Sequence, residues 1–180
     1  MRKKLTKLIP EFELLQDNEL KVKVFTVWEK ALDVRGMQPE DLLRMPFTLL
    51  IKPCPVNFIE HCRGVVQVSY QIGQALKKVY GDKVPINLDY LLAGALLHDV
   101  GKILEYVEKN GQFTKSNEGK YVRHPFSGVG LAFDEEIPEE VLHIIAVHAG
   151  EGDGHWRSTE GIIVHHADFI NFEPLHAGKK

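Results

Sequence analysis

The stretch Leu96-Leu97-His98-Asp99-Val100-Gly101-Lys102 decides the fold, because it sets an adjacent histidine and aspartate at the end of the least polar segment of the chain. Residues 88–100 are almost wholly apolar and follow Asn87, a suitable N-cap, so we expect a helix from Leu88 to Val100 that is buried on all sides. Burying a neutral polar group without a partner costs about 2–7 kcal/mol, and a charge costs much more. A cation shared by His98 and Asp99 would remove that cost.

Further helices are predicted on both sides of this segment. Apolar residues recur at spacings of three and four over residues 18–34 and 56–80, and a short helix is expected at 40–44. Later helices are expected to begin at His124, Pro138 and Ser158 and to end near Phe133, Ala149 and Asn171. The pair Asn110-Gly111 predicts one short β-hairpin near residues 105–116. The fold class is therefore all-α, with this hairpin as the exception.

Composition favours one domain built on this helical pattern. The 180 residues are 44% hydrophobic, and the formal net charge of −3 gives no general attraction for nucleic acid. We expect residues 1–55 to form an N-terminal helical cap or an extension of the same domain. Residues 56–173 would be a metal-binding helical core and residues 174–180 a C-terminal tail. No apolar run reaches the roughly 18–20 residues of a membrane span and no secretory signal is recognisable, so a cytoplasmic protein without a membrane partner is expected.

Side chains that commonly bind metals occur in separate predicted helices or at their ends. They are His61, His98, Asp99, His124, His148 and Asp168. Imidazole and carboxylate together suit a hard-to-borderline divalent metal, whereas Cys54 and Cys62 lack the paired spacing of a thiolate site. Each histidine taken alone could instead be a hydrogen-bonded residue of the core. The residues alone therefore favour a metal site without excluding that reading.

The order of these residues resembles that of the HD-domain metal-dependent phosphohydrolase superfamily. Residues 97–102 are similar to the HDxGK helix end of that superfamily, and the segments around His61 and Asp168 resemble its first and last ligand helices. His124-Pro125-Phe126-Ser127-Gly128 and Ile144-Ile145-Ala146-Val147-His148 look like the additional pair of members that hold two metals. The resemblance covers roughly residues 56–172 and implies an HD-domain helical bundle with an N-terminal helical extension.

Carried over residue by residue, the resemblance implies a dinuclear site. His61, His98, Asp99 and Asp168 would hold a first metal, and Asp99 would bridge to a second metal held by His124 and His148. The cofactors would be two divalent ions, drawn from Fe, Mn, Zn, Co, Ni and Mg. Asp99 and Lys102 are the catalytic candidates, and candidates for contact with the substrate are Lys102, Arg123, Arg157 and His165. A lysine that complements a helix dipole and arginines exposed on the surface are the structural alternatives.

The reaction implied by the resemblance is hydrolysis of a phosphomonoester or phosphodiester by metal-activated water. The expected substrate is a nucleotide or a related small molecule; the acidic net charge argues against nucleic acid but leaves a short oligonucleotide open. Two alternatives keep the same ligands: a mixed-valent di-iron oxygenase of the myo-inositol oxygenase type, and a nucleotide-binding domain without catalysis. The sequence leaves the oligomeric state open, and a homodimer is one option.

Overall fold

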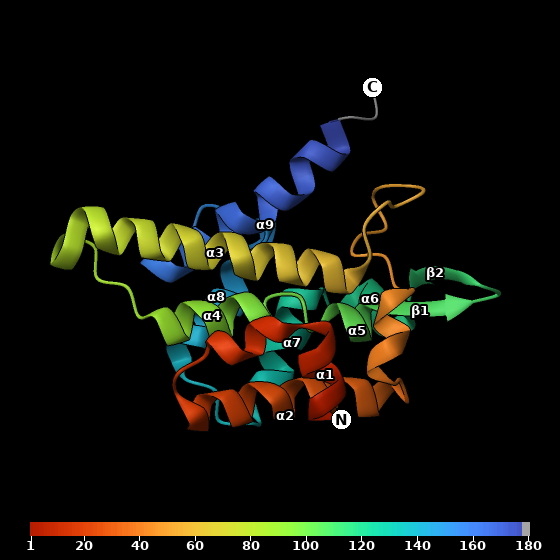
Figure 1. Ribbon diagram of the computed structural model, residues 1–180. Coiled ribbons are helices and arrows are strands. Elements are labelled where there is room, and N and C mark those ends of the chain that lie inside the picture. The colour runs from red at the N-terminus through yellow and green to blue at the C-terminus, as the bar shows by residue number, and fades with distance from the viewer. Residues whose placement is uncertain (178–180) are drawn as a thin grey trace.

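Helix α4 (Leu88–Leu97) lies at the centre of the computed structural model, which describes residues 1–177 (Figure 1). It packs against α3 (Phe58–Tyr80), α8 (Glu139–Val147), α9 (Thr159–Ala177) and α2 (Asn18–Arg35). Residues 91–97 are all buried, which confirms the predicted central helix. The predicted end at Val100 is wrong, because the chain tightens after Leu97 and the Val100 amide donates to the Leu97 carbonyl at 3.1 Å.

The residues before α3 form a layer against one side of α4. This N-terminal layer comprises α1 (Arg2–Leu8), the 3₁₀ turn η1 (Pro10–Leu14), α2 and the 3₁₀ turn η2 (Pro39–Leu43). Trp28 of α2 is fully buried, and its Nε1 donates a hydrogen bond to the Leu96 carbonyl of α4 at 3.1 Å. The segment 40–44, which the sequence predicts as an α-helix, corresponds to the 3₁₀ turn η2. Gln38 and Asp41 form a capping box at the start of this turn.

Helix α3 ends at Tyr80 as the sequence predicts, but it begins at Phe58, two residues after the predicted start. Asn57 and Glu60 form a capping box at its start, and Gly81 follows its last residue with a φ of 56°. The 3₁₀ turn η3 (Gly81–Lys83) then leads towards α4.

After α4 come α5 (Lys102–Glu105) and the predicted hairpin, which is confirmed as β1 (Tyr106–Lys109) paired with β2 (Gln112–Lys115). Asn110 and Gly111 have φ values of 51° and 75°, the left-handed pair that a type I′ turn requires. A short helix that the sequence pattern did not predict, α6 (Asn117–Tyr121), follows the hairpin.

The last third of the chain is α7 (His124–Phe133), α8, the 3₁₀ turn η4 (Gly150–Gly152) and α9. Helix α8 ends at Val147, two residues before the predicted Ala149, and η4 begins at Gly150. Helix α9 continues past the predicted end near Asn171 to Ala177 and contains Pro174 within it. Residues 174–177 of the predicted tail are thus helical, and residues 178–180 lie outside the described residues.

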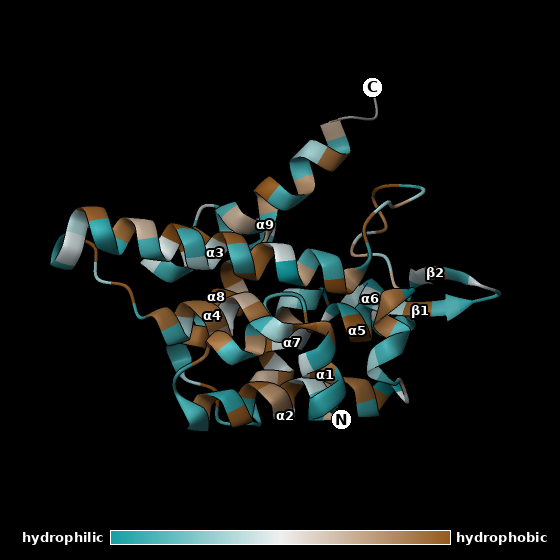
Figure 2. Cartoon of the chain, in the orientation of Figure 1, coloured by the Kyte–Doolittle hydropathy of each residue, from teal (hydrophilic) through white to brown (hydrophobic). Residues whose placement is uncertain are grey.

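Hydrophobic residues gather where the helices face one another, and α4 is the most uniformly hydrophobic of them (Figure 2). Within residues 1–177, no helix has both the length and the apolar character that crossing a membrane requires.

Candidate metal centre

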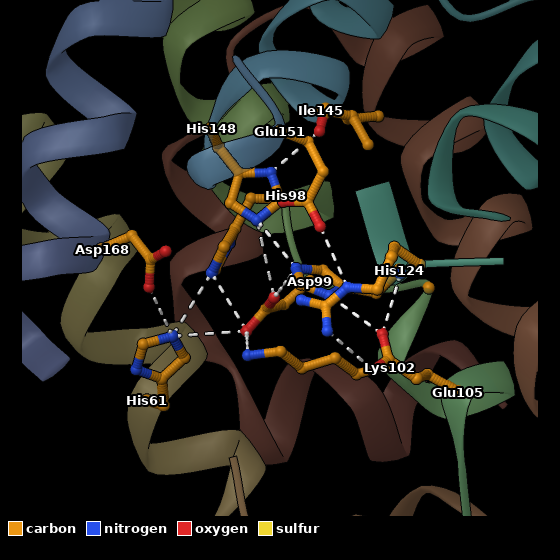
Figure 3. Close-up of polar contacts among 12 residues, drawn as sticks. His61, His98, Asp99, Lys102, Glu105, His124, Ile145, His148, Glu151 and Asp168 are labelled. Atoms are coloured by element: carbon orange, nitrogen blue, oxygen red, sulfur yellow. Dashed lines mark hydrogen bonds and ion pairs between the residues drawn. The ribbon is translucent and has the colours of Figure 1, made fainter. Parts of the chain in front are cut away.

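The carboxylate of Asp99 lies between two groups of histidines (Figure 3). Its Oδ2 is 3.3 Å from His61 Nε2 and 3.4 Å from His98 Nε2. Its Oδ1 is 3.2 Å from His124 Nε2 and 3.7 Å from His148 Nε2. We call His61, His98, Asp99 and Asp168 the first cluster, and Asp99, His124 and His148 the second cluster. The structure thus brings together all six residues that the sequence analysis named.

The first cluster is assembled by three helices that pack on one another. His61 comes from the first turns of α3, His98 follows the last residue of α4, and Asp168 belongs to α9. His61 Nε2 lies 3.1 Å from Asp168 Oδ1 and 3.4 Å from His98 Nε2. The His61 ring stacks on Phe47 with ring centroids 4.3 Å apart, but no described residue provides a hydrogen-bond partner for its Nδ1. Packing therefore orients this ring.

The second cluster is assembled by two short helices. His124 is the first residue of α7 and His148 follows the last residue of α8, and their Nε2 atoms are 3.2 Å apart. Glu105 Oε2 accepts hydrogen bonds from the backbone N of His124 at 2.8 Å and from its Nδ1 at 3.0 Å. His148 Nδ1 donates to the Ile145 carbonyl at 2.8 Å. Hydrogen bonds therefore orient both rings of this cluster.

The protonation of the histidine rings makes the two clusters suitable for binding a cation. A backbone carbonyl can only accept a hydrogen bond, so Nδ1 of His98, bonded to the Ala95 carbonyl at 2.7 Å, and Nδ1 of His148 both carry the proton. In the neutral form of each ring, Nε2 then carries a lone pair. Nε2 of His98 faces His61 Nε2 at 3.4 Å, and Nε2 of His148 faces His124 Nε2 at 3.2 Å. Both also face the carboxylate of Asp99. The buried Oδ1 of Asp99 also has no hydrogen-bond donor among the described residues. Facing acceptors repel, and a divalent metal converts the repulsion into coordination.

The charges of the first cluster also favour a cation. Burial alone would lower the pKa of His61, but its hydrogen bonds to Asp168 and Asp99 outweigh burial and raise that pKa. Burial alone would raise the pKa of Asp99, but Lys102 and His98 hold it well below its ordinary range. Burial alone would also raise the pKa of Asp168, but its hydrogen bond to His61 lowers it. Both carboxylates are therefore ionised, and the His61 imidazole between them is drawn towards positive charge.

The second cluster keeps His124 ready to coordinate. Burial lowers the pKa of His124 to about 4, although the hydrogen bond to Glu105 works in the opposite direction. The imidazole is therefore neutral near pH 7, which is the form that binds a metal.

Lys102 is the cation fixed nearest to Asp99. Its Nζ lies 2.6 Å from Asp99 Oδ2 and the residue is 8% exposed. Burial alone would lower the pKa of Lys102, but the charge of Asp99 outweighs burial and raises it. The helix of His98 does not continue to Lys102; the turn at 98–101 instead brings the ammonium back onto the carboxylate. Lys102 therefore remains charged at the wall of the site.

Gly101 explains the glycine in the HDxGK segment. A Cβ at this position would lie 2.1 Å from the carbonyl oxygen of His124 and 2.7 Å from the amide nitrogen of Gly128. Both are backbone atoms of α7 and cannot move aside without shifting the helix. The absence of a side chain at Gly101 therefore allows α7 to bring His124 up to Asp99.

Glu105 is the functional residue that the sequence analysis missed. It is 2% exposed, and it faces Lys115 Nζ at 3.4 Å and Arg123 Nη1 at 3.6 Å as well as His124. Burial alone would raise the pKa of Glu105, but its hydrogen bonds and charge interaction with His124 lower it to about 2. The sequence analysis placed Glu105 only at the start of the predicted hairpin, and its one signal was a position three residues after Lys102.

A cavity of 640 Å³ opens beside the two clusters, and its residues come from segments far apart in the sequence. Lys102, Lys115 and Arg123 line it on the side of α5 and the hairpin. Arg123, the N-cap of α7, also donates to Glu151 of η4 at 2.9 Å. Arg123 therefore lies where the sequence analysis expected it, beside the metal ligands.

The other two substrate candidates act differently. Arg157 donates to the carbonyls of Val147 and Ala149 at 2.8 and 3.1 Å, so it holds the chain just after α8 and does not line the cavity. His165 Nδ1 donates to the His148 carbonyl at 2.7 Å. Both side chains support the segment that carries His148, and neither faces the cavity beside the clusters.

Comparison with known proteins agrees with this geometry. The model of the HD domain family matches residues 58–171. A dihydroneopterin 2′,3′-cyclic phosphate phosphodiesterase of Methanocaldococcus jannaschii is 29% identical over 173 residues, which cover 91% of this chain and 67% of the relative. The 3′-5′ exoribonuclease YhaM of Listeria welshimeri is 27% identical, over 65% of this chain and 40% of the relative. YhaM of Oceanobacillus iheyensis is 35% identical, over 58% and 33%. No solved structure matches the chain significantly.

The family model covers more than half of the chain, so the chain belongs to the HD-domain family. Its phosphodiesterase relatives and its buried histidine and aspartate clusters make it a metal-dependent phosphohydrolase.

Proposed function

We propose that the chain hydrolyses a cyclic phosphodiester on a small, nucleoside-like molecule, with two divalent metals held by the first and second clusters. The observation that carries the proposal is the position of Asp99, whose two oxygens each face a separate pair of imidazole nitrogens. One carboxylate shared in this way is the arrangement that a dinuclear hydrolytic site needs. Such a site holds the scissile phosphate at the floor of the 640 Å³ cavity.

When bound, the two cations would supply Lewis-acid activation of the phosphoryl group and of the attacking water. The residues of the chain provide charge and orientation. Lys102 keeps its proton because Asp99 raises its pKa, so it offsets the negative charge that develops on the phosphoryl oxygens and does not act as a general acid. Arg123 offers a planar guanidinium at the side of the cavity, and binding a phosphate oxygen requires that it leave Glu151.

A small cyclic phosphodiester is favoured over RNA by the extent of the similarity. The relatedness to the cyclic phosphate phosphodiesterase extends over 91% of this chain and so includes most of the N-terminal layer, which the HD family model leaves out. The two exoribonucleases match 65% and 58% of the chain, which spans well under half of their length. The net charge of −3 also gives no extended attraction for a polyanion.

The test combines metal analysis with a panel of substrates. We expect the purified protein to contain close to two divalent metals per chain and to hydrolyse a 2′,3′-cyclic nucleotide faster than a 3′,5′-cyclic nucleotide, a phosphomonoester or a short oligoribonucleotide. Preferred cleavage of the oligoribonucleotide would show that the substrate is RNA and not a small cyclic phosphodiester.

The two alternative functions give different results in the same assay. Oxygen uptake with two redox-active irons and no phosphoester cleavage would establish the oxygenase. Saturable nucleotide binding without product, with metal restored, would establish a binding domain.

A further inference from the structure

One wall of the cavity is aromatic and adjoins the first cluster. Helix α9 carries Asp168, Phe169 and Phe172 along the face that lines the cavity, because residues three and four apart share a helix face. Across from them, residues 47–50 complete the wall, and the rings of Phe47 and Phe172 meet edge to face with centroids 6.2 Å apart. The ligand face of α9 therefore becomes an apolar wall one turn beyond its metal ligand.

The exposure of these side chains distinguishes them from core residues. Phe12 and Phe58 are fully buried, whereas Phe169 and Phe172 are only partly buried and Leu50 is 77% exposed. Histidines of the same helix pack on both rings, His165 on Phe169 and His176 on Phe172, while the two phenylalanines also line the cavity. Leaving apolar surface open to a cavity costs stability unless something packs on it. The adjoining metal clusters and the cations of the opposite wall identify the occupant as an anion that also carries an apolar group.

We propose that Phe169, Phe172 and the 47–50 segment form a subsite that binds a planar heteroaromatic ring of the substrate by stacking, while the phosphate lies at the clusters. This inference rests on the proposed function and adds the part of the substrate that does not react. Aromatic faces stack with flat rings at a gain of about 1–3 kcal/mol per ring. A 640 Å³ cavity has room for a fused ring together with a ribose phosphate.

The polar groups of this wall cannot select one ring over another. Thr48 is 6% exposed, and its hydroxyl already accepts a hydrogen bond from the Leu50 amide at 3.2 Å. Among the described lining residues there is no asparagine or glutamine that would read the edge of a base. The subsite therefore recognises the flatness of the ring, and purine and pterin-like rings should bind within about tenfold of each other, because stacking is tolerant of ring identity.

The experiment compares two substrates that share a five-membered cyclic phosphodiester. One is 2′,3′-cyclic AMP, which carries a ring, and the other is the cyclic phosphate of propane-1,2-diol, which carries none. In Phe169→Leu and Phe172→Leu we expect KM for the first to rise about tenfold, with kcat unchanged and both constants for the second unchanged. Phe133→Leu is the matched control, because Phe133 is 69% exposed at the end of α7 and lies outside the cavity.

A binding measurement separates this inference from the proposed function. Adenosine, which lacks phosphate, is titrated calorimetrically into the metal-free protein in the presence of a chelator. Saturable binding that weakens in Phe172→Leu and persists in Phe133→Leu supports the subsite even if no phosphodiester is hydrolysed. The inference is overturned if adenosine binds both variants equally, or if KM rises by the same factor for both cyclic substrates. Hydrolysis of neither substrate by the unmodified protein would count against the proposed function alone.

Discussion

The first and second clusters share Asp99 but are held in different ways. In the first cluster, the His61 ring is fixed by stacking on Phe47, and its Nδ1 has no hydrogen-bond partner among residues 1–177. In the second cluster, the His124 ring is fixed by the ionised carboxylate of Glu105. One backbone carbonyl holds His98 in the first cluster and another holds His148 in the second, so the clusters differ in the remaining histidine. His61 depends on packing against Phe47, and His124 depends on the charge of Glu105. The difference teaches that substitutions which leave Asp99 in place can weaken one cluster and spare the other.

The largest effect is expected from Asp99→Asn, which removes the difference between the clusters by damaging both. The amide keeps the shape of the side chain but not its charge, so both metals should be lost and hydrolysis should fall by at least about 10³-fold. Metal content by elemental analysis and kcat/KM for the cyclic substrate are the measurements. Asp134→Asn, at an exposed side chain, is the control. Retention of two metals in Asp99→Asn would contradict the shared carboxylate.

Gly101→Ala should separate the clusters next most strongly. The added methyl group meets the His124 carbonyl, so α7 must shift and carry His124 away from Asp99. We expect a loss of about 1–3 kcal/mol in the free energy of unfolding and loss of the second metal, with the first retained. Gly130→Ala, within α7, is the matched control, because a Cβ at Gly130 meets no other atom. In a helix, alanine is more stable than glycine by up to about 1 kcal/mol. Equal loss of both metals would show that Gly101 serves the whole site.

Glu105→Gln tests the charge that supports the second cluster. The amide can no longer act as an ionised acceptor for His124 Nδ1, so affinity for the second metal should fall about 10–100-fold while that for the first is unchanged. Competition with a chelator at graded metal concentrations measures both affinities. Glu108→Gln, in the neighbouring strand β1, is the control because Glu108 pairs with Arg44 and not with a ligand. An unchanged second affinity would exclude a role for Glu105 in metal binding.

Phe47→Leu is the corresponding test of packing at the first cluster. The leucine fills space but does not stack on the His61 ring, a contact worth about 0.5–1.5 kcal/mol. Affinity for the first metal should therefore fall about 2–13-fold and that for the second should not change. The same chelator competition measures both affinities. A fall in the affinity for the second metal alone would contradict the assignment of Phe47 to the first cluster.

The smallest effect is expected from Asp41→Asn in the N-terminal layer, outside both clusters. Hydrogen bonding from the Gln38 backbone, followed by Arg44, lowers the pKa of Asp41. A lowered pKa contributes stability above the ordinary value near 4, and that contribution is lost as the pH falls through the folded-state pKa. Denaturant unfolding should show a difference from Asp41→Asn of at most about 1 kcal/mol at pH 7 that shrinks below pH 4, with both metals retained. A difference that grew in acid would have the wrong sign.

The sequence was sufficient where one residue type implies one local geometry. The apolar run before His98 predicted the central helix, and the Asn110-Gly111 turn predicted the hairpin. The order of the six candidate ligands picked out side chains that the structure brings together around Asp99, and their binding of metal stays a prediction. The sequence was insufficient where contacts join distant segments. The sequence placed Glu105 at the start of the hairpin, and its burial depends on contact with α7, a segment distant in the sequence. Arg157 was a candidate for binding the substrate, but its guanidinium instead donates hydrogen bonds to backbone carbonyls at the end of α8 and just after it.

The hydrogen bond from Trp28 to the Leu96 carbonyl limits how far the protein can be shortened. The family model begins at residue 58, yet a fragment starting there would leave that carbonyl and the adjoining apolar flank of α4 facing water, two residues before His98 of the first cluster. The smallest piece that folds into a working hydrolase therefore includes the segment upstream of the family boundary.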